Sequence, residues 1–199
     1  MKTELESMKP WKRWVAAAGF FTATALALYS AKCEETKPAG KPEQRQVQTT
    51  NSLDYKTTNF TNDTEQVLLA RMLFGEARNC TDEEKIAVAY TAVNRARDKK
   101  KWNGETVREA ILKPWQYSCL NNNDPNKSKL MNPMSYDPKS FERCLTISSN
   151  VLASKYEDLS KGATHYFNPN IVTPSWATNM IKIGHIPTSK GLSRHEFYK

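Results

Sequence analysis

The segment Leu68–Asn79, LLARMLFGEARN, decides the fold that we expect for this chain, because it combines an apolar helical stripe with one acidic residue. In a helix, Leu69, Met72 and Leu73 share a face with Glu76. A carboxyl group on such a face loses hydration, which favours the protonated form that can donate a proton. Glu76 is therefore the candidate general acid.

Glu76 also has a purely structural interpretation. It could pair with Arg71 or Arg78, or it could mark the solvated edge of the helix near its end. Periodicity alone favours this structural interpretation, so further motifs must decide between the two.

The composition indicates one domain of ordinary size plus an appendage, since the chain has 199 residues. Its net charge of +8 suggests an anionic partner, which could be nucleic acid, a membrane surface or an acidic polymer such as a bacterial wall. Many lysines lie in short clusters such as residues 98–101, which are typical of solvated loops. Charge alone therefore does not select the partner.

Residues 1–32 are predicted to be an N-terminal signal peptide or signal-anchor. The uncharged run Val15–Ala31 follows a basic flank that should stay in the cytoplasm, formed by Lys9, Lys12 and Arg13. The run contains a possible cleavage site at residues 25–27, whereas about 17 apolar residues can also just span a bilayer. We therefore expect export to the periplasm or cell wall, with possible tethering to the inner membrane.

Residues 33–59 are polar and show no apolar periodicity, so they are predicted to be a flexible linker before a folded domain at residues 60–199. Export would place all four cysteines where disulfides are permitted: Cys33, Cys80, Cys119 and Cys144. No CxxC or histidine-rich spacing indicates a metal site, and we expect neither a metal nor another cofactor.

Capping signatures predict the helices of the domain. Asn62 or Asp63 can cap the first helix, which runs through Glu76. Two Thr-x-x-Glu patterns predict a helix over about residues 82–97 and a short helix that ends at Lys113, before a proline.

A further helix begins at Asp137-Pro138, where a cap residue precedes a proline in the first turn. This helix places Cys144 where it could reach back to Cys119. We therefore predict a disulfide between Cys119 and Cys144 that fastens the preceding loop to the helix.

The segment Trp115–Tyr136 is predicted to be a long irregular loop, because it is rich in Asn, Pro and Ser. Trp115 and Tyr117 are natural platforms for a sugar ring, and Gln116 and Ser118 can form hydrogen bonds. Core packing of the two aromatic rings is the alternative.

The C-terminal part contains β-prone runs around residues 164–167 and 196–198, with a short helix expected between Pro174 or Ser175 and Met180. These runs predict a small β element beside a mostly helical body. The expected fold class is therefore mainly α, or α+β.

Several separated motifs resemble those of the SleB/CwlJ-type cell-wall hydrolases, the spore cortex-lytic enzyme family. In chain order they are LLARMLFGEARN, AVAYTAVNRARD, PWQYSCLNNNDPN, GATHYFNP, PSW and HEFY, and they cover about Glu65–Lys199. The resemblance implies a lysozyme-like, mainly helical catalytic domain that acts on peptidoglycan glycan strands. The glutamate of the family's GEAR motif is its catalytic acid, which is Glu76 here. The family typically continues GEARGE, whereas this chain has Asn79 and Cys80.

The short chain with its signal also resembles exported lysis enzymes, or endolysins, of phages that infect Gram-negative bacteria. Some of these enzymes use a releasable signal-anchor. A bond between Cys33 and Cys80, or an exchange of their partners, could couple release from the membrane to activity; an unpaired or structural Cys80 is the alternative.

Two reactions fit a catalytic Glu76. A glycoside hydrolase needs a second carboxylate, and no spacing marks Asp82, Asp124 or Asp137 as that group. A lytic transglycosylase needs one acid, and the resemblance points to this reaction between N-acetylmuramic acid and N-acetylglucosamine. The candidate residues of the sugar groove are Gln116, Tyr117, Ser118, His165, Tyr166 and Trp176. Core packing is the alternative for Tyr166 and Trp176, and a hydrogen bond to the backbone is the alternative for His165. We expect Asn94 and Arg95 to tie the second helix to the groove wall.

Two other functions compete with this one. A zinc-dependent N-acetylmuramoyl-L-alanine amidase would need clustered ligands, and three scattered histidines favour it little. A non-catalytic wall-binding module would use the charge and the aromatic rings. We expect a monomer whose partners are peptidoglycan glycan strands and, through the N-terminal segment, the inner membrane; no nucleic acid is expected.

Overall fold

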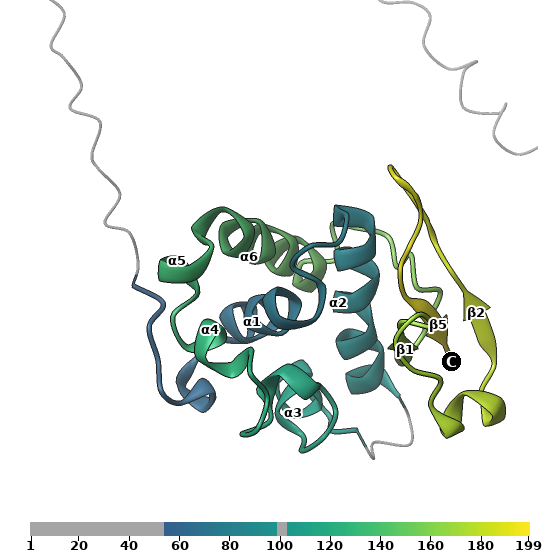
Figure 1. Cartoon of the computed structure of the whole chain (residues 1–199), viewed down its shortest axis with the longest axis horizontal. Helices are drawn as coiled ribbons and strands as arrows, with labels where there is room; N and C mark the ends of the chain where they lie inside the picture. Colours follow the sequence, from purple (N-terminus) through teal and green to yellow (C-terminus); the bar gives the residue numbers. More distant parts are fainter. Residues whose placement is uncertain (1–53, 99–102) are drawn as a thin grey trace, which may run out of the picture. The chain divides into compact units, whose positions relative to one another are not determined.

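The computed structural model describes residues 54–98 and 103–199. In this part, helices surround the central helix α1 (Glu65–Ala77), and a small sheet lies beside α2 (Asp82–Arg97) (Figure 1). Helix α1 contacts α2, α3 (Val107–Leu112), α4 (Lys127–Met131) and α6 (Pro138–Leu152). The expected fold class, mainly α with a small β element, is confirmed.

Helix α1 begins one or two residues later than we predicted. Its cap is Thr64, whose hydroxyl accepts the N–H of Val67. Asn62 lies in the preceding 3-10 turn η3 (Phe60–Asn62), and Asp63 forms an ion pair with Arg71. The prediction that Asn62 or Asp63 caps α1 was therefore wrong.

The predicted apolar stripe of α1 forms the core. Leu69, Met72 and Leu73 are completely buried. Burial of three large apolar side chains contributes about 1.5–3 kcal/mol each. The middle of α1, residues 68–74, is therefore fixed by packing, whereas its first turn and the turn around Glu76 are partly exposed.

Three other predicted helices are confirmed together with their caps. The hydroxyls of Thr81 and Thr106 and the carboxylate of Asp137 each accept a backbone N–H in the first turn that follows. Thr106 and Glu109 form a complete capping box, because each side chain binds the other's backbone N–H. The three helices are α2, α3 and α6.

The segment that we predicted to be irregular contains short helices. They are the 3-10 turn η4 (Ser118–Leu120), α4, and α5 (Pro133–Tyr136). Leu130 of α4 is completely buried, so this segment is anchored in the core. Such short helices have no measurable apolar periodicity, which is why the sequence pattern did not indicate them.

The sheet contains three antiparallel strands in the order β1-β5-β2, formed by His165–Phe167, Glu196–Tyr198 and Lys182–Gly184. Strands β3 (Pro187–Thr188) and β4 (Gly191–Leu192) form a separate pair. The β-prone runs predicted β1 and β5, and the expected short helix is the 3-10 turn η5 (Ser175–Asn179). Strands β2, β3 and β4 were not predicted, because their sequences, KIG, PT and GL, contain Lys, Pro and Gly and lack the aromatic residues of β1 and β5.

The predicted disulfide between Cys119 and Cys144 is not formed, and both thiols are free and buried. Cys119 lies in η4 and packs against Gly75 of α1. Cys144 lies in α6, where its nearest charged neighbours include Lys85 and Asp82. The two cysteines therefore contact different sets of neighbours, and α6 does not bring Cys144 back to the loop.

The predicted signal segment, residues 1–32, and Cys33 lie outside the described residues, so its cleavage, its anchoring and a bond to Cys80 stay predictions. Within residues 54–98 and 103–199, no helix is both long enough and apolar enough to cross a membrane. The packed body includes Tyr55, whose ring meets that of Phe141 edge to face at 5.2 Å. Packing therefore extends N-terminal to Phe60, where we expected the folded domain to begin.

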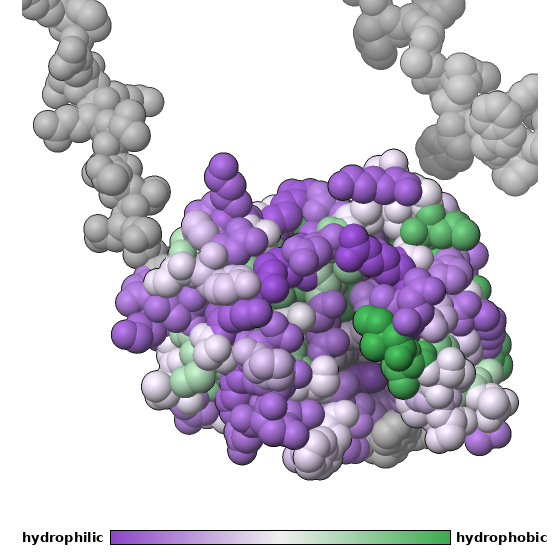
Figure 2. Space-filling model, in the orientation of Figure 1, coloured by the Kyte–Doolittle hydropathy of each residue, from purple (hydrophilic) through white to green (hydrophobic). Residues whose placement is uncertain are grey.

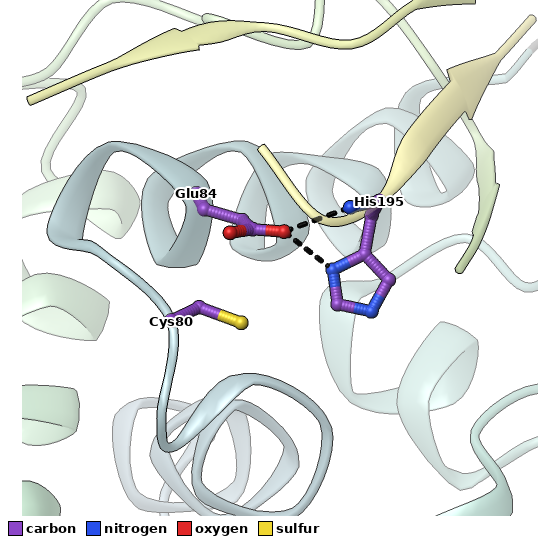
Figure 3. Close-up of side chains that lie close together, drawn as sticks. All are labelled: Cys80, Glu84 and His195. Carbon is purple, nitrogen blue, oxygen red and sulfur yellow. Dashed lines mark hydrogen bonds and ion pairs between the residues drawn. The ribbon is translucent and has the colours of Figure 1, made fainter. Parts of the chain in front are cut away.

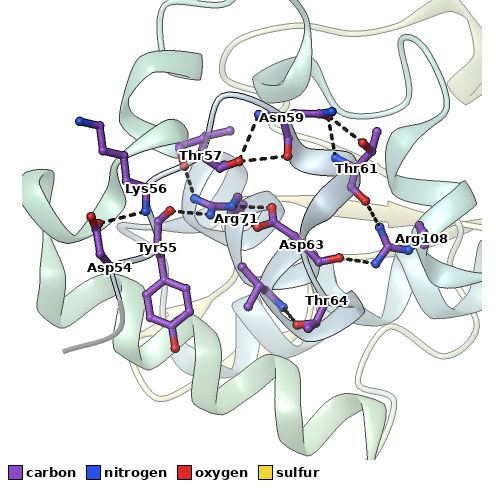
Figure 4. A network of polar contacts seen from close by, with 12 residues as sticks. Asp54, Tyr55, Lys56, Thr57, Asn59, Thr61, Asp63, Thr64, Arg71 and Arg108 are labelled. Atoms are coloured by element: carbon purple, nitrogen blue, oxygen red, sulfur yellow. Dashed lines mark hydrogen bonds and ion pairs between the residues drawn. The ribbon is translucent and has the colours of Figure 1, made fainter. Parts of the chain in front are cut away.

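A buried arginine joins the start of this body to its centre (Figure 4). The side chain of Arg71 is 1% exposed, and its Nε donates to Asp63 Oδ2 at 2.7 Å. Its remaining donors bind the backbone oxygens of Tyr55 and Leu130. One guanidinium thus connects α1, α4 and the segment before η3.

Replacing Arg71 with Ala should lower the free energy of unfolding by about 3–5 kcal/mol, because Asp63 and two backbone oxygens lose their donors in a buried position. The exposed pair of Arg143 and Asp82, whose side chains are 46% and 42% exposed, is the control. Arg143→Ala should cost about 1 kcal/mol or less. Denaturant titration of both variants measures the difference, and equal losses would contradict a central role for Arg71.

Candidate functional site

A cleft of about 730 Å³ is lined by four segments of the chain. They are the last turn of α1, the loop at residues 115–118, β1 and the segment that follows β1. The face of the molecule seen in Figure 2 is mostly hydrophilic and is hollowed near its middle, with a hydrophobic patch at the edge of the hollow. Polar and aromatic side chains line the cleft together. This combination suits a sugar, which presents hydroxyl groups at its edge and an apolar face.

Both oxygens of Glu76 are held by hydrogen-bond donors. Oε1 accepts the backbone N–H of Cys119 at 3.2 Å and the hydroxyl of Ser118 at 3.4 Å. Oε2 accepts the hydroxyl of Tyr166 at 3.2 Å. The half-buried carboxylate is therefore fixed in the cleft by two chain segments that are far from it in sequence.

Gly75 permits this arrangement, because η4 packs directly on α1 at this residue. A Cβ atom at residue 75 would lie 2.5 Å from the Cβ of Cys119 and 2.6 Å from its sulfur. Only glycine allows this approach, which brings the N–H of Cys119 within reach of Glu76. The Gly-Glu order of the motif thus has a steric reason.

Tyr166 is placed by the sheet. It pairs with Phe197 of β5, and its ring meets that of His195 edge to face at 5.1 Å. Burial, and next the nearby carboxylate of Glu76, raise the pKa of Tyr166 well above its usual value. Tyr166 therefore keeps its proton and acts as a constant donor to Glu76.

The second helix connects the two walls of the cleft, as we predicted for Asn94 and Arg95. Arg95 is 4% exposed, donates from Nε to the backbone oxygen of Thr164 at 2.6 Å and lies over the ring of Tyr117 at 4.7 Å. Asn94 donates to the backbone oxygen of Ala163. The start of β1 and the loop at residues 115–118 are thereby fixed to α2.

Aromatic side chains form the more open part of the cleft. The rings of His165 and Trp176 are 5.1 Å apart. Burial, and next the charge of Arg95, lower the pKa of His165 to about 4, so its ring is neutral near pH 7. Trp115 is 78% exposed and has a φ of 68°, a left-handed conformation that is rare for a bulky residue.

The cleft collects most of the residues that we predicted for the site. The predicted residues that line it are Glu76, Gln116, Ser118, His165, Tyr166 and Trp176. Their roles in binding and catalysis stay predictions. Three residues that also line the cleft were not predicted: Ile171, Val172 and His195. The terminal HEFY motif was the only signal that included one of them.

Tyr117 is the exception among the predicted groove residues. It is 2% exposed, and its hydroxyl lies 3.3 Å from that of Thr91 on α2. Its ring fills the core below Arg95, so the alternative of core packing is correct for Tyr117. The neighbouring Trp115 points outward instead and lines the cleft.

Gly75→Ala should lower the free energy of unfolding by about 1–3 kcal/mol, because the added methyl group overpacks the contact with Cys119. Without this contact the change would raise helix stability, since alanine is favoured over glycine by about 1 kcal/mol in a helix. Adding Cys119→Gly should restore part of the loss. A stabilised Gly75→Ala variant would contradict the close approach.

A proton NMR titration of His165 should give a midpoint near 4, well below the ordinary value of 6.5. Between these two values the unfolded chain binds more protons than the folded chain, so this group makes stability fall as the pH falls. His165→Asn should therefore make stability less dependent on pH in this range. A midpoint near 6.5 would show that the ring is not desolvated.

Comparison with known proteins gives a family and two solved structures. The family model described as Cell Wall Hydrolase matches residues 80–190. The catalytic domain of the germination-specific lytic transglycosylase SleB from Bacillus anthracis has 19% identity and a TM-score of 0.49, covering 69% of this chain and 96% of that chain. The catalytic domain of the Bacillus cereus SleB protein has 17% identity and a TM-score of 0.43, covering 73% of this chain and 96% of that chain. No match was found among curated proteins.

The family match begins at Cys80, directly after the turn that follows Glu76. It includes η4, β1 and η5, and hence the donors that surround the Glu76 carboxylate. Glu76 itself is assigned to the site by its hydrogen bonds and its place in the cleft. The family match spans more than half of the residues of this chain, and the chain therefore belongs to the cell wall hydrolase family.

Proposed function

We propose that this protein cleaves the glycan strands of peptidoglycan between N-acetylmuramic acid and N-acetylglucosamine, as a lytic transglycosylase with Glu76 as its acid. Membership of the cell wall hydrolase family supplies the substrate class. The geometry around Glu76 supports the reaction class.

The presence of a single carboxylate in the cleft is the observation that supports a transglycosylase. Among the described residues that line the cleft, Glu76 is the only acidic one. A retaining or inverting hydrolase would place a second carboxyl group roughly 5–9.5 Å away, across the scissile bond. The aspartates that we considered have other tasks: Asp82 pairs with Arg143, Asp124 binds the N–H of Asn126, and Asp137 caps α6.

One carboxyl group can complete the reaction in two steps. Glu76 first donates its proton to the oxygen that joins C1 of N-acetylmuramic acid to the next sugar, and that bond breaks. The resulting carboxylate then takes the proton of the muramyl 6-hydroxyl, whose oxygen bonds to C1. The product is a 1,6-anhydro ring, no water is consumed, and Glu76 regains its proton.

The donors around Glu76 suit both steps, because they hold the carboxylate in one orientation while its charge changes. The backbone N–H of Cys119 cannot rotate away, and η4 keeps it in place. Tyr166 remains a donor throughout, as its raised pKa requires. Such preorganised dipoles stabilise developing charge without rearrangement during the reaction.

We also propose that the site acts outside the cytoplasm, where its substrate lies. The basic flank and the uncharged run Val15–Ala31 support export, with the membrane as a second partner through this segment. A signal-anchor would give the protein the behaviour of the phage endolysins that it resembles. Fractionation of cells that express the full chain, with Lys9, Lys12 and Arg13 changed to Glu as a comparison, tests the role of this segment.

Glu76→Gln should lower the rate of wall cleavage by about 10²–10⁴-fold, because glutamine cannot donate a proton. Mass spectrometry of purified peptidoglycan digested by the full chain should show anhydro-muropeptides, and the variant should lose them. Products with ordinary reducing ends would contradict a transglycosylase, and free stem peptides would indicate an amidase.

Matched variants distinguish a catalytic loss from a folding defect. Asp82→Asn and Asp124→Asn change a carboxylate outside the cleft to its amide, and both should keep a rate near that of the unchanged protein. Glu76→Gln keeps oxygen and nitrogen atoms that can still contact Ser118, so it should unfold at a similar denaturant concentration. If an aspartate variant were as inactive as Glu76→Gln, a second carboxylate would be needed.

A further inference from the structure

Three side chains of the kind that bind metal ions converge in the fold (Figure 3), and one of them, His195, also lines the cleft. Cys80 follows α1, Glu84 lies in the first turn of α2, and His195 directly precedes β5. Their ligand atoms all lie within 4.8 Å of one another. In residues 54–98 and 103–199, no other group of His, Cys, Asp and Glu meets this condition.

The carboxylate of Glu84 is already directed at His195. Glu84 is 2% exposed, and its Oε1 accepts the backbone N–H of His195 at 2.9 Å. The same oxygen lies 2.8 Å from Nδ1 of the ring, whose side chain is 12% exposed. Figure 3 shows the sulfur of Cys80 facing the same space. An oxygen, a nitrogen and a sulfur atom therefore surround one largely desolvated point.

We propose that Cys80, Glu84 and His195 bind a zinc ion. Zinc accepts thiolate, imidazole and carboxylate ligands at ~2.0–2.3 Å and prefers four of them, so one position is left for water. A thiolate and a carboxylate balance the charge of the ion. Binding releases the proton of the thiol and any proton held between Nδ1 and Glu84. Calcium and magnesium fit less well, because both prefer sites made of oxygen.

The side chains need to move little to form this site. Ligand atoms at these bond lengths around a tetrahedral ion lie ~3.5 Å apart. Oε1 of Glu84 and Nδ1 of His195 are 2.8 Å apart, so these two atoms need to separate slightly. The sulfur of Cys80 lies within 4.8 Å of the other ligand atoms, so a small adjustment of its side chain would bring it to this spacing.

The ion would fix one wall of the cleft and would take no part in the proton transfers. It would hold His195, whose ring packs against Tyr166, and Tyr166 donates to Glu76. It would also join the first turn of α2 to the start of β5, two segments that are 111 residues apart in sequence. This separation explains why spacing within the sequence gave no sign of a metal site.

The test measures zinc binding directly, so its outcome does not depend on the enzymatic activity. The full chain without an affinity tag is stripped with a chelator and titrated with Zn²⁺ against a chromophoric competitor. We expect about one zinc ion per chain. Cys80→Ala should weaken binding by about 100-fold or more, since even a change beyond the ligands costs 10–100-fold. Cys144→Ala, which removes another free cysteine, should leave binding unchanged.

The absorption spectrum of bound Co²⁺ tests whether the thiolate of Cys80 is a ligand. Co²⁺ bound to the unchanged protein should show a thiolate-to-metal charge-transfer band that Cys80→Ala loses and Cys144→Ala keeps. His195→Gln should weaken binding, whereas His185→Gln, which alters a histidine outside the cluster, should not. Cys80→Ala leaves the bond between Glu84 and His195 intact, and thermal unfolding checks that this variant is folded. Absence of stoichiometric zinc, or a band that survives Cys80→Ala, would overturn the proposal.

Discussion

The contact between Gly75 and Cys119 is the constraint on which the site depends. Helix α1 is buried from Leu68 to Phe74, so the position of its last turn is set by the core. At Gly75 the side chain of Cys119 from η4 comes so close to α1 that no Cβ atom fits between them. The N–H of Cys119 then reaches the carboxylate of Glu76. One missing Cβ atom therefore determines how the loop at residues 115–118 meets α1.

The helices were predictable because local signals and tertiary packing agree. Thr81, Thr106 and Asp137 cap helices whose apolar residues repeat with helical spacing, so each signal supports the other. At Asp63 the two disagree. Its side chain can cap a helix, but the buried guanidinium of Arg71 binds it more strongly, and the helix begins after Thr64 instead. A competing partner from within the fold cannot be read from the local sequence.

The candidate site was predictable where a motif fixes the chemistry and not where packing fixes the direction of a side chain. Gln116 and Ser118 line the cleft, whereas Tyr117 between them is buried, because the backbone is extended at Tyr117 and turns its side chain away from those of its two neighbours. The same composition made both aromatic residues, Trp115 and Tyr117, look equally suited to binding. The prediction that Cys119 pairs with Cys144 failed for a related reason, since the sequence does not show which neighbours each cysteine packs against.

Helix α2 is the element that places the sheet relative to Glu76, because charged side chains at both of its ends hold the strands. Near its C-terminal end, Arg95 binds the backbone oxygen of Thr164, just before β1. In its first turn, Glu84 binds the backbone and ring of His195, just before β5.

Both of these charged groups are almost completely buried. Removing the partner of either group would therefore lower the free energy of unfolding by several kcal/mol. Strands β1 and β5 pair with each other, and Tyr166 lies within that pairing. The distance from Tyr166 to Glu76 is thus set by two contacts at opposite ends of one helix. A change at either contact can therefore alter the position of Tyr166, and with it the hydrogen bond to Glu76, without touching the carboxylate.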